Sequence, residues 1–196
     1  MSSLEFIRKA IAIEAHAISI LLEQVGPDYE PVIDVLNNCK GKVVITGVGK
    51  SGHIGKKMAA SFASTGTPAF FMHSTEGVHG DLGMIEEHDV VLMISNSGET
   101  AEVLSLLPSL KKIGAKKIAI TSNGKSTLAT ACDFSLTYHY EQEADHIGVA
   151  PTTSSTIVLV IGDALAVALC EMRRFTKEDF HLYHPGGSLG RQLSQQ

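Results

Sequence analysis

A loop rich in hydroxyl groups follows one of the most apolar runs of this sequence. It reads SNSGET over residues 95–100 and leads into a helical stretch. Hydroxyls and free backbone N–H groups at the start of a helix bind phosphate. Ordinary helix capping is the alternative, with Ser97 or Thr100 as the cap and Glu102 inside the first turn. The two interpretations are compatible, so Ser95, Ser97 and Thr100 are candidate phosphate ligands.

A second loop reads GVGKSG over residues 47–52, between an apolar run and another helical stretch. Its glycine spacing formally matches the dinucleotide-binding fingerprint. That fingerprint also needs an acid at the end of the next strand, to hold the ribose hydroxyls. The next apolar run ends in FFMH over residues 70–73 and has no acid. What remains is a glycine-rich turn that presents Lys50 and Ser51 to a ligand.

Carboxylates and histidines for acid–base chemistry are present, but their local sequence does not single them out. Glu143 lies in a polar stretch and reads by itself as a solvated carboxylate, while His184 precedes Pro-Gly-Gly and reads as a turn residue. Nine histidines raise the question of a metal, and the tightest cluster is His73, His79 and Asp81. No HExxH or comparable ligand spacing accompanies it. We therefore expect no functional metal.

Short apolar runs alternate with helical stretches through the middle of the chain. The expected strands cover residues 43–46, 69–72, 90–94, 117–121 and 134–137. The expected helices between them cover residues 52–63, 101–113 and 126–131. This alternation predicts an α/β fold, a doubly wound parallel five-stranded sheet flanked by helices. Ligands of such sheets bind beyond the carboxyl ends of the strands, which are the ends that carry the two loops above.

Further helices are expected on either side of this core. The first is capped by Ser2 or Ser3 and carries an almost wholly aliphatic face through Leu22, which docks either on a partner subunit or on its own sheet. A second helix runs through Leu36, and two more cover residues 153–173 and 176–180. We expect one domain over residues 1–196. Its parts are N-terminal helices (1–40), an α/β core (41–175), and a C-terminal helix with an HPGG tail (176–196).

Composition excludes several classes of protein. The 196 residues are 44% hydrophobic and carry a net charge of −5, without a basic stretch that could track nucleic acid. The apolar run over residues 156–170 contains Asp163 and is expected to be a buried helix, too short for a bilayer, with a partner for that carboxylate. Cys39, Cys132 and Cys170 fit neither a disulfide framework nor a zinc site. We expect a cytoplasmic protein.

Taken together, the motifs resemble those of a known family. SNSGET resembles the phosphosugar-binding signature of the sugar isomerase (SIS) domain. Longer segments look like the D-arabinose 5-phosphate isomerases, namely residues 47–66, 79–84, 150–155, 162–168 and 184–191. The resemblance implies a Rossmann-like SIS fold and interconversion of D-ribulose 5-phosphate and D-arabinose 5-phosphate, the first step toward the lipopolysaccharide sugar Kdo.

The resemblance also implies which residues act. Family positions of catalytic importance fall on Lys50, Glu102, Glu143 and His184, and phosphate contacts fall on Ser51, Ser95, Ser97 and Thr100. Aldose–ketose isomerisation through an enediolate needs a base, a donor for the oxyanion and a fixed phosphate. The base is one of Glu102, Glu143 and His184, and His184 is alternatively a residue that opens the sugar ring. Lys50 would steady oxygens or phosphate, with no metal or cofactor.

Two features of the chain differ from many family members. Those isomerases continue after the HPGG segment into a pair of CBS regulatory domains, whereas this sequence ends at Gln196, so we expect the single-domain form. Asp145-His146 replaces the Cys-Pro pair that commonly follows the family position of Glu143, and this change close to a candidate catalytic residue leaves the substrate preference open. SIS proteins assemble, and a homotetramer is expected, with a dimer as the next choice.

Three other functions compete with this one. The first is isomerisation of another phosphosugar, and the second is non-catalytic phosphosugar sensing by a SIS module. The third, a nicotinamide-dependent dehydrogenase, rests on the glycine spacing alone.

Overall fold

A five-stranded parallel sheet organises the computed structural model, which describes residues 2–185. Its strands are β1 (Val43–Gly47), β2 (Ala69–His73), β3 (Val90–Ile94), β4 (Lys116–Thr121) and β5 (Phe134–Thr137). They lie in the order β2-β1-β3-β4-β5. The predicted fold class is confirmed, and each predicted strand is correct to within one residue at either end.

Alternate strand residues build two separate cores, one on each face of the sheet. Val43 and Ile45 of β1 join one cluster of buried side chains, while Val44 joins the other. Successive side chains of a strand point to opposite faces. Because both faces are covered, β1 and β3 are buried along their whole length, which explains their unbroken aliphatic sequence.

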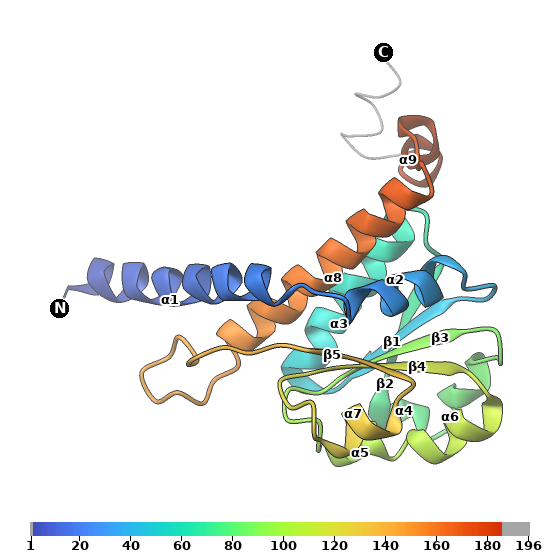
Figure 1. The fold of residues 1–196 in the computed structure, drawn as a ribbon, viewed down its shortest axis with the longest axis horizontal. Helices are drawn as coiled ribbons and strands as arrows, with labels where there is room; N and C mark the ends of the chain where they lie inside the picture. Colours follow the sequence, from blue (N-terminus) through green and yellow to red (C-terminus); the bar gives the residue numbers. More distant parts are fainter. Residues whose placement is uncertain (1, 186–196) are drawn as a thin grey trace.

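Helices cover both faces of the sheet (Figure 1). One face carries α2 (Tyr29–Asn37), α3 (Gly49–Ser64) and α8 (Thr153–Met172), with α1 (Ser3–Gln24) packed on α8. The other face carries α5 (Ala101–Leu104), α6 (Leu107–Ile113) and α7 (Thr127–Ala131). Two short elements that were not predicted, α4 (Ser74–Gly77) and the 3-10 turn η1 (Asp81–Met84), follow β2, and α9 (Lys177–Tyr183) follows α8.

The single helix predicted over residues 101–113 is wrong, because two helices occupy this stretch. α5 ends at Leu104 and α6 begins at Leu107, with Pro108 in its first turn. Proline has no N–H to donate, and its ring clashes with the carbonyl four residues earlier in a continuous helix. The chain therefore breaks ahead of Pro108 and restarts with proline at a position that tolerates it.

α8 corrects two further expectations. It has 20 residues, so the apolar segment is not too short for a bilayer; among the described residues it is the one helix whose length and composition would suffice. Half of its most apolar window is buried against the rest of the protein, as in a core helix. Asp163 is not buried, since its side chain is 44% exposed. It forms an ion pair with Lys57 and accepts a hydrogen bond from Ser61 of α3.

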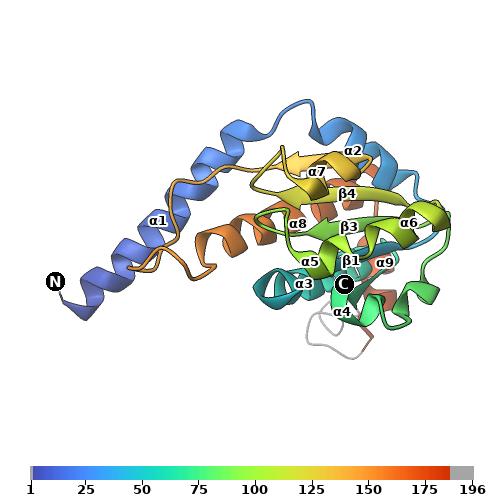
Figure 2. The ribbon, with the colours of Figure 1, turned by 90° about the horizontal axis from the view of Figure 1, so that it is seen from below.

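α1 is packed at one end and projects at the other. Ser2 caps it, and Ala17 and Leu21 are buried toward α8. Its N-terminal half extends away from the sheet and its helices (Figure 2), with Ile7 56% and Ile11 63% exposed. The helix thus docks on its own domain through its C-terminal half, while an apolar N-terminal face is left uncovered.

Candidate functional site

The strand order creates a crevice between β1 and β3. After β1 the chain passes to α3 on one face of the sheet, and after β3 it passes to α5 on the other. Neighbouring parallel strands whose connections diverge in this way leave an open crevice at their carboxyl ends, where α/β proteins bind ligands. The two loops that border it are residues 47–52 and 95–100, the loops that the sequence singled out.

Hydrogen bonds within the loop after β3 fix its shape. The Ser95 hydroxyl lies 2.7 Å from the Thr100 hydroxyl and accepts a bond from the Gly98 N–H at 3.0 Å. Ser95 is buried and Ser97 is exposed, where its hydroxyl accepts from the Glu99 N–H. Thr100 occupies the N-cap position of α5, but its side chain bonds Ser95 and caps no helical N–H. The structure therefore brings Ser95 and Thr100 together inside the loop, with Ser97 at its surface.

The N-terminus of α7 supports this loop from behind. Gly98 has a φ of +70°, and an added Cβ would overlap the side chain of Ser126. Glycine is thus required here by both conformation and space. The Glu99 carboxylate accepts the Thr127 N–H at 2.7 Å, and this bond holds its pKa below the usual range. Loop and helix consequently form one rigid unit.

Lys50 and Ser51 lie in the first turn of α3, beside the crevice. The Lys50 side chain is exposed, and within residues 2–185 it has no hydrogen-bond or ion-pair partner. Ser51 is half-buried and borders a cavity of about 40 Å³. Asn96 and Ser154 border the same cavity. The loops after β1 and β3 therefore meet the N-terminus of α8 at one point.

Glu143 is buried and accepts hydrogen bonds at both carboxylate oxygens. Oε1 accepts from the Tyr140 hydroxyl at 3.1 Å. Oε2 accepts from the backbone N–H groups of Thr152 and Ser154, at 2.8 and 3.2 Å, and from the Thr152 hydroxyl at 3.1 Å. Burial alone would raise the pKa of this carboxyl, but the hydrogen bonds from Ser154 and Thr152 outweigh it and hold the pKa below its usual value. Glu143 is not the solvated carboxylate that its local sequence suggests.

Asp145 organises the loop between Glu143 and α8. Its carboxylate accepts the N–H groups of Ile147, Val149 and Ala150 at 2.8 to 2.9 Å. Burial would raise its pKa, but these backbone bonds keep the pKa below the usual value. Asp145 is thus a local cap for this turn.

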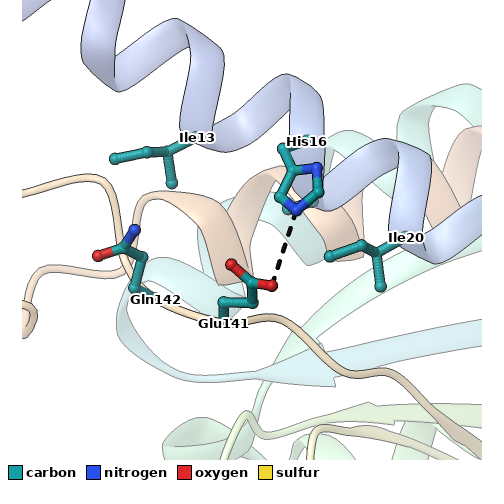
Figure 3. Close-up of a pocket in the computed structure, with 6 residues that line it drawn as sticks. Ile13, His16, Ile20, Glu141 and Gln142 are labelled. Carbon is teal, nitrogen blue, oxygen red and sulfur yellow. Dashed lines mark ion pairs between the residues drawn. The ribbon is translucent and has the colours of Figure 1, made fainter.

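The segment that carries Glu143 lies against α1. Figure 3 shows Glu141 facing His16 of α1, and the two side chains form an exposed ion pair at 3.7 Å. Gln24 also exchanges two hydrogen bonds with the backbone of His139, at 2.7 and 3.1 Å. Glu143 borders two open cavities, about 580 Å³ beside α1 and about 340 Å³ beside Ser122. Ligand-sized space is therefore present on both sides of this carboxylate.

Two predicted site residues lie apart from this network. Glu102 is exposed in α5, and in the described part of the chain its side chain has no partner. His184 ends α9, where its Nδ1 lies 2.8 Å from the Phe180 carbonyl and its ring stacks on the Phe180 ring. α9 follows the C-terminus of α8, at the opposite end of that helix from Ser154 (Figure 1). Within one chain, His184 and Glu143 therefore do not lie together. The rest of the predicted tail, residues 186–196, lies outside the described residues.

Sequence reasoning missed Asn96, Tyr138, Tyr140 and Thr152. Asn96 stands between the two serines of the loop, and Tyr138 and Tyr140 alternate in the extended segment after β5. Side chains two residues apart in an extended segment point to the same side, and this spacing was the signal available in the sequence.

In residues 2–185 no group of three or more His, Cys, Asp and Glu residues is arranged to hold a metal ion.

The fold and these loops define a doubly wound α/β domain with a crevice at its topological switch point, where proteins of this class bind their ligands. The chain belongs to the SIS domain family, whose model matches residues 36–168.

Known relatives are close to it over nearly its whole length. It is 51% identical to the arabinose 5-phosphate isomerase KdsD of Pseudomonas aeruginosa over 97% of this chain and 60% of the relative. It is 50% identical to the arabinose 5-phosphate isomerase KpsF of Escherichia coli over 95% of this chain and 58% of the relative. The chain thus spans about 60% of the length of these curated relatives.

Solved structures agree in fold. An E. coli protein in complex with arabinose 5-phosphate is 51% identical, with a TM-score of 0.89, over 94% of this chain and 100% of that chain. A putative sugar-phosphate isomerase from Listeria monocytogenes is 33% identical, with a TM-score of 0.91, over 95% of this chain and 100% of that chain.

Proposed function

We propose that this protein is an aldose–ketose isomerase that interconverts D-ribulose 5-phosphate and D-arabinose 5-phosphate through an enediolate. The observation that carries the proposal is its similarity to the E. coli structure in complex with arabinose 5-phosphate, all of which it covers at 51% identity. The curated arabinose 5-phosphate isomerases support the same reaction.

The phosphate would be held at the crevice between β1 and β3. Ser51, Ser97 and Thr100 line or border the two loops there, and Ser95 shapes the second loop from inside. The N-terminus of α3 adds backbone N–H groups and the positive end of its dipole. Phosphate held in this way places the sugar carbons along the crevice, toward the cavities beside Glu143.

Four further side chains supply the remaining chemistry in this proposal. Isomerisation removes the proton on C2 of the aldose, leaves an enediolate, and returns a proton to C1. Lys50, whose ammonium has no partner within residues 2–185, would stabilise developing charge on oxygen. Glu102, Glu143 and His184 remain the candidates for the proton transfers, which contribute about 10²–10⁴ in rate.

A complete site would need a second copy of the chain. His184 lies at the far end of α8 from Glu143, so a site that includes both takes the histidine from another subunit. The uncovered apolar face of α1 supports self-association, and we propose a homotetramer. Three free thiols support a cytoplasmic location.

A coupled assay tests the activity. The purified protein is given D-arabinose 5-phosphate, formation of D-ribulose 5-phosphate is followed, and glucose 6-phosphate serves as the control substrate. We expect turnover of D-arabinose 5-phosphate and none of glucose 6-phosphate. The Glu102→Gln and His184→Ala variants should lose activity by at least about tenfold. No turnover, while arabinose 5-phosphate still raises the melting temperature, would instead indicate a phosphosugar sensor or an isomerase of another phosphosugar.

A further inference from the structure

Tyr140 connects the phosphate-binding loop to the Glu143 carboxylate. Its hydroxyl lies 3.0 Å from Nδ2 of Asn96 and 3.1 Å from Oε1 of Glu143. Asn96 itself belongs to the loop after β3, and its backbone carbonyl accepts three further bonds, from the Thr121 hydroxyl and from the hydroxyl and N–H of Ser122. One hydroxyl thus joins a firmly anchored loop residue to a buried acid.

The direction of these hydrogen bonds is fixed by proton count. A tyrosine hydroxyl has one proton, and an ionised carboxylate only accepts. Tyr140 therefore donates to Glu143 and must accept from the Asn96 amide nitrogen. The amide oxygen is left to accept the Tyr138 hydroxyl at 2.9 Å. Each donor and acceptor in the chain Tyr138–Asn96–Tyr140–Glu143 has one consistent role.

The other oxygen of Glu143 holds the start of α8. Oε2 accepts from Thr152, the N-cap residue of α8, and from the Ser154 N–H in its first turn. Glu143 is 9% exposed, so its orientation depends on these donors and on Tyr140. The carboxylate consequently lies between two fixed points, the loop after β3 and the N-terminus of α8.

We propose that Asn96 and Tyr140 are positioning residues, which act through Glu143 and hold its carboxylate in register with the phosphate-binding loop. This inference rests on the proposed function, because its kinetic consequence requires turnover. In the proposed site, the loop that carries Asn96 binds the phosphate of the sugar, and the reacting carbons face Glu143. These are the two ends of the series of hydrogen bonds described above. Misplacement of a site group by an ångström is enough to lower the rate greatly while binding persists.

The Tyr140→Phe variant tests this, because it removes the one atom that joins Asn96 to Glu143. Loss of a hydrogen bond to a charged group predicts a fall in kcat of about 10- to 100-fold. KM for arabinose 5-phosphate should stay within about threefold, since the phosphate loop keeps its own bonds. Asn96→Ala provides a second variant and should lower kcat in the same direction.

Two matched tyrosine variants serve as controls. Tyr138→Phe also deletes a hydroxyl bonded to Asn96, but that hydroxyl does not reach Glu143, so its kcat should fall less than that of Tyr140→Phe. Tyr29→Phe, in α2, removes a hydroxyl that makes no hydrogen bond to residues 2–185 and should leave kcat unchanged. Equal losses in the Tyr138 and Tyr140 variants, a wild-type kcat in Tyr140→Phe, or a rise in KM alone would overturn the proposal.

Hydrogen exchange separates this inference from the proposed function. The Thr152 and Ser154 amides should exchange faster in Tyr140→Phe than in Tyr138→Phe, whether or not the protein turns over a sugar. If the wild-type protein shows no turnover, the isomerase proposal is refuted. The link between Asn96 and Glu143 is then tested by the hydrogen-exchange rates of these two amides alone. Unchanged exchange in Tyr140→Phe would refute that link.

Discussion

Residue-scale behaviour of the site is governed by the donors that surround Glu143. Three bonds on Oε2 and one on Oε1 hold a carboxylate that is nearly removed from water. An ionised acceptor in such a position ties the segment after β5 to α8, in addition to any part it has in proton transfer. Its charge should therefore be measurable as stability.

Glu143→Gln keeps the shape of the side chain but removes this charge, and should lower the free energy of unfolding at neutral pH by about 1–3 kcal/mol. The folded-state pKa is lowered from the ordinary 4.5. The carboxylate's contribution is thus fully present above pH 4.5 and is lost as the pH falls through the folded-state pKa. Urea unfolding of both proteins between pH 3 and pH 8 measures it. A stability difference that stays constant across this range would contradict the account.

At this scale, sequence reasoning predicted where some of the candidate residues lie and missed the surroundings of others. Ser51, Ser95 and Thr100 were predictable because they lie in glycine- and hydroxyl-rich loops at strand ends. The burial of Glu143 could not be predicted, because its donors at Thr152 and Ser154 come from the start of α8. No local sequence pattern determines the path of the loop that brings them to Glu143. The separation of His184 from Glu143 depends on the length and direction of α8, which again is a tertiary property.

At the scale of the elements, the loop after β3 has a tightly constrained geometry. Gly98 combines a positive φ with contact against Ser126, so the loop and α7 hold each other in place. The strands and most helices were predictable from periodicity, whereas the break between α5 and α6 needed the steric effect of Pro108 to be weighed above the apolar pattern.

Gly98→Ala should therefore damage the site as well as the fold. We expect a loss of about 1–3 kcal/mol in unfolding free energy, from the strained φ and the overlap with Ser126. Binding of inorganic phosphate, measured by calorimetry, should weaken together with stability. Gly83→Ala is the matched control, because a Cβ there meets no atom within 4 Å and its φ is not positive. If both variants behaved alike, the loop would not have the constraint described.

On the scale of the whole molecule, α1 carries an uncovered apolar face. Leu4, Phe6, Ile7 and Ile11 are each more than half exposed on the part of the helix that projects (Figure 2). Exposed apolar surface of this extent is typical of an interface. The proposed role of His184 requires the same, because one chain does not bring His184 to Glu143.

Ile7→Glu should then shift the protein from the proposed tetramer toward smaller species in light scattering coupled to size exclusion. Catalytic activity should fall with it, since in the proposed assembly His184 completes the site of a neighbouring subunit. Met84→Glu, at an equally apolar exposed position in η1, is the control and should leave the assembly unchanged. A monomeric wild-type protein with full activity would contradict both the assembly and the shared site.

The central claim, isomerisation through an enediolate, is tested most directly by NMR of D-arabinose 5-phosphate incubated with the protein in D₂O. We predict that D-ribulose 5-phosphate forms and that the C2 proton of the remaining arabinose 5-phosphate is replaced by deuterium, because the base exchanges with solvent before the proton returns. Absence of conversion, or conversion with the original hydrogen fully retained in the sugar, would contradict the account.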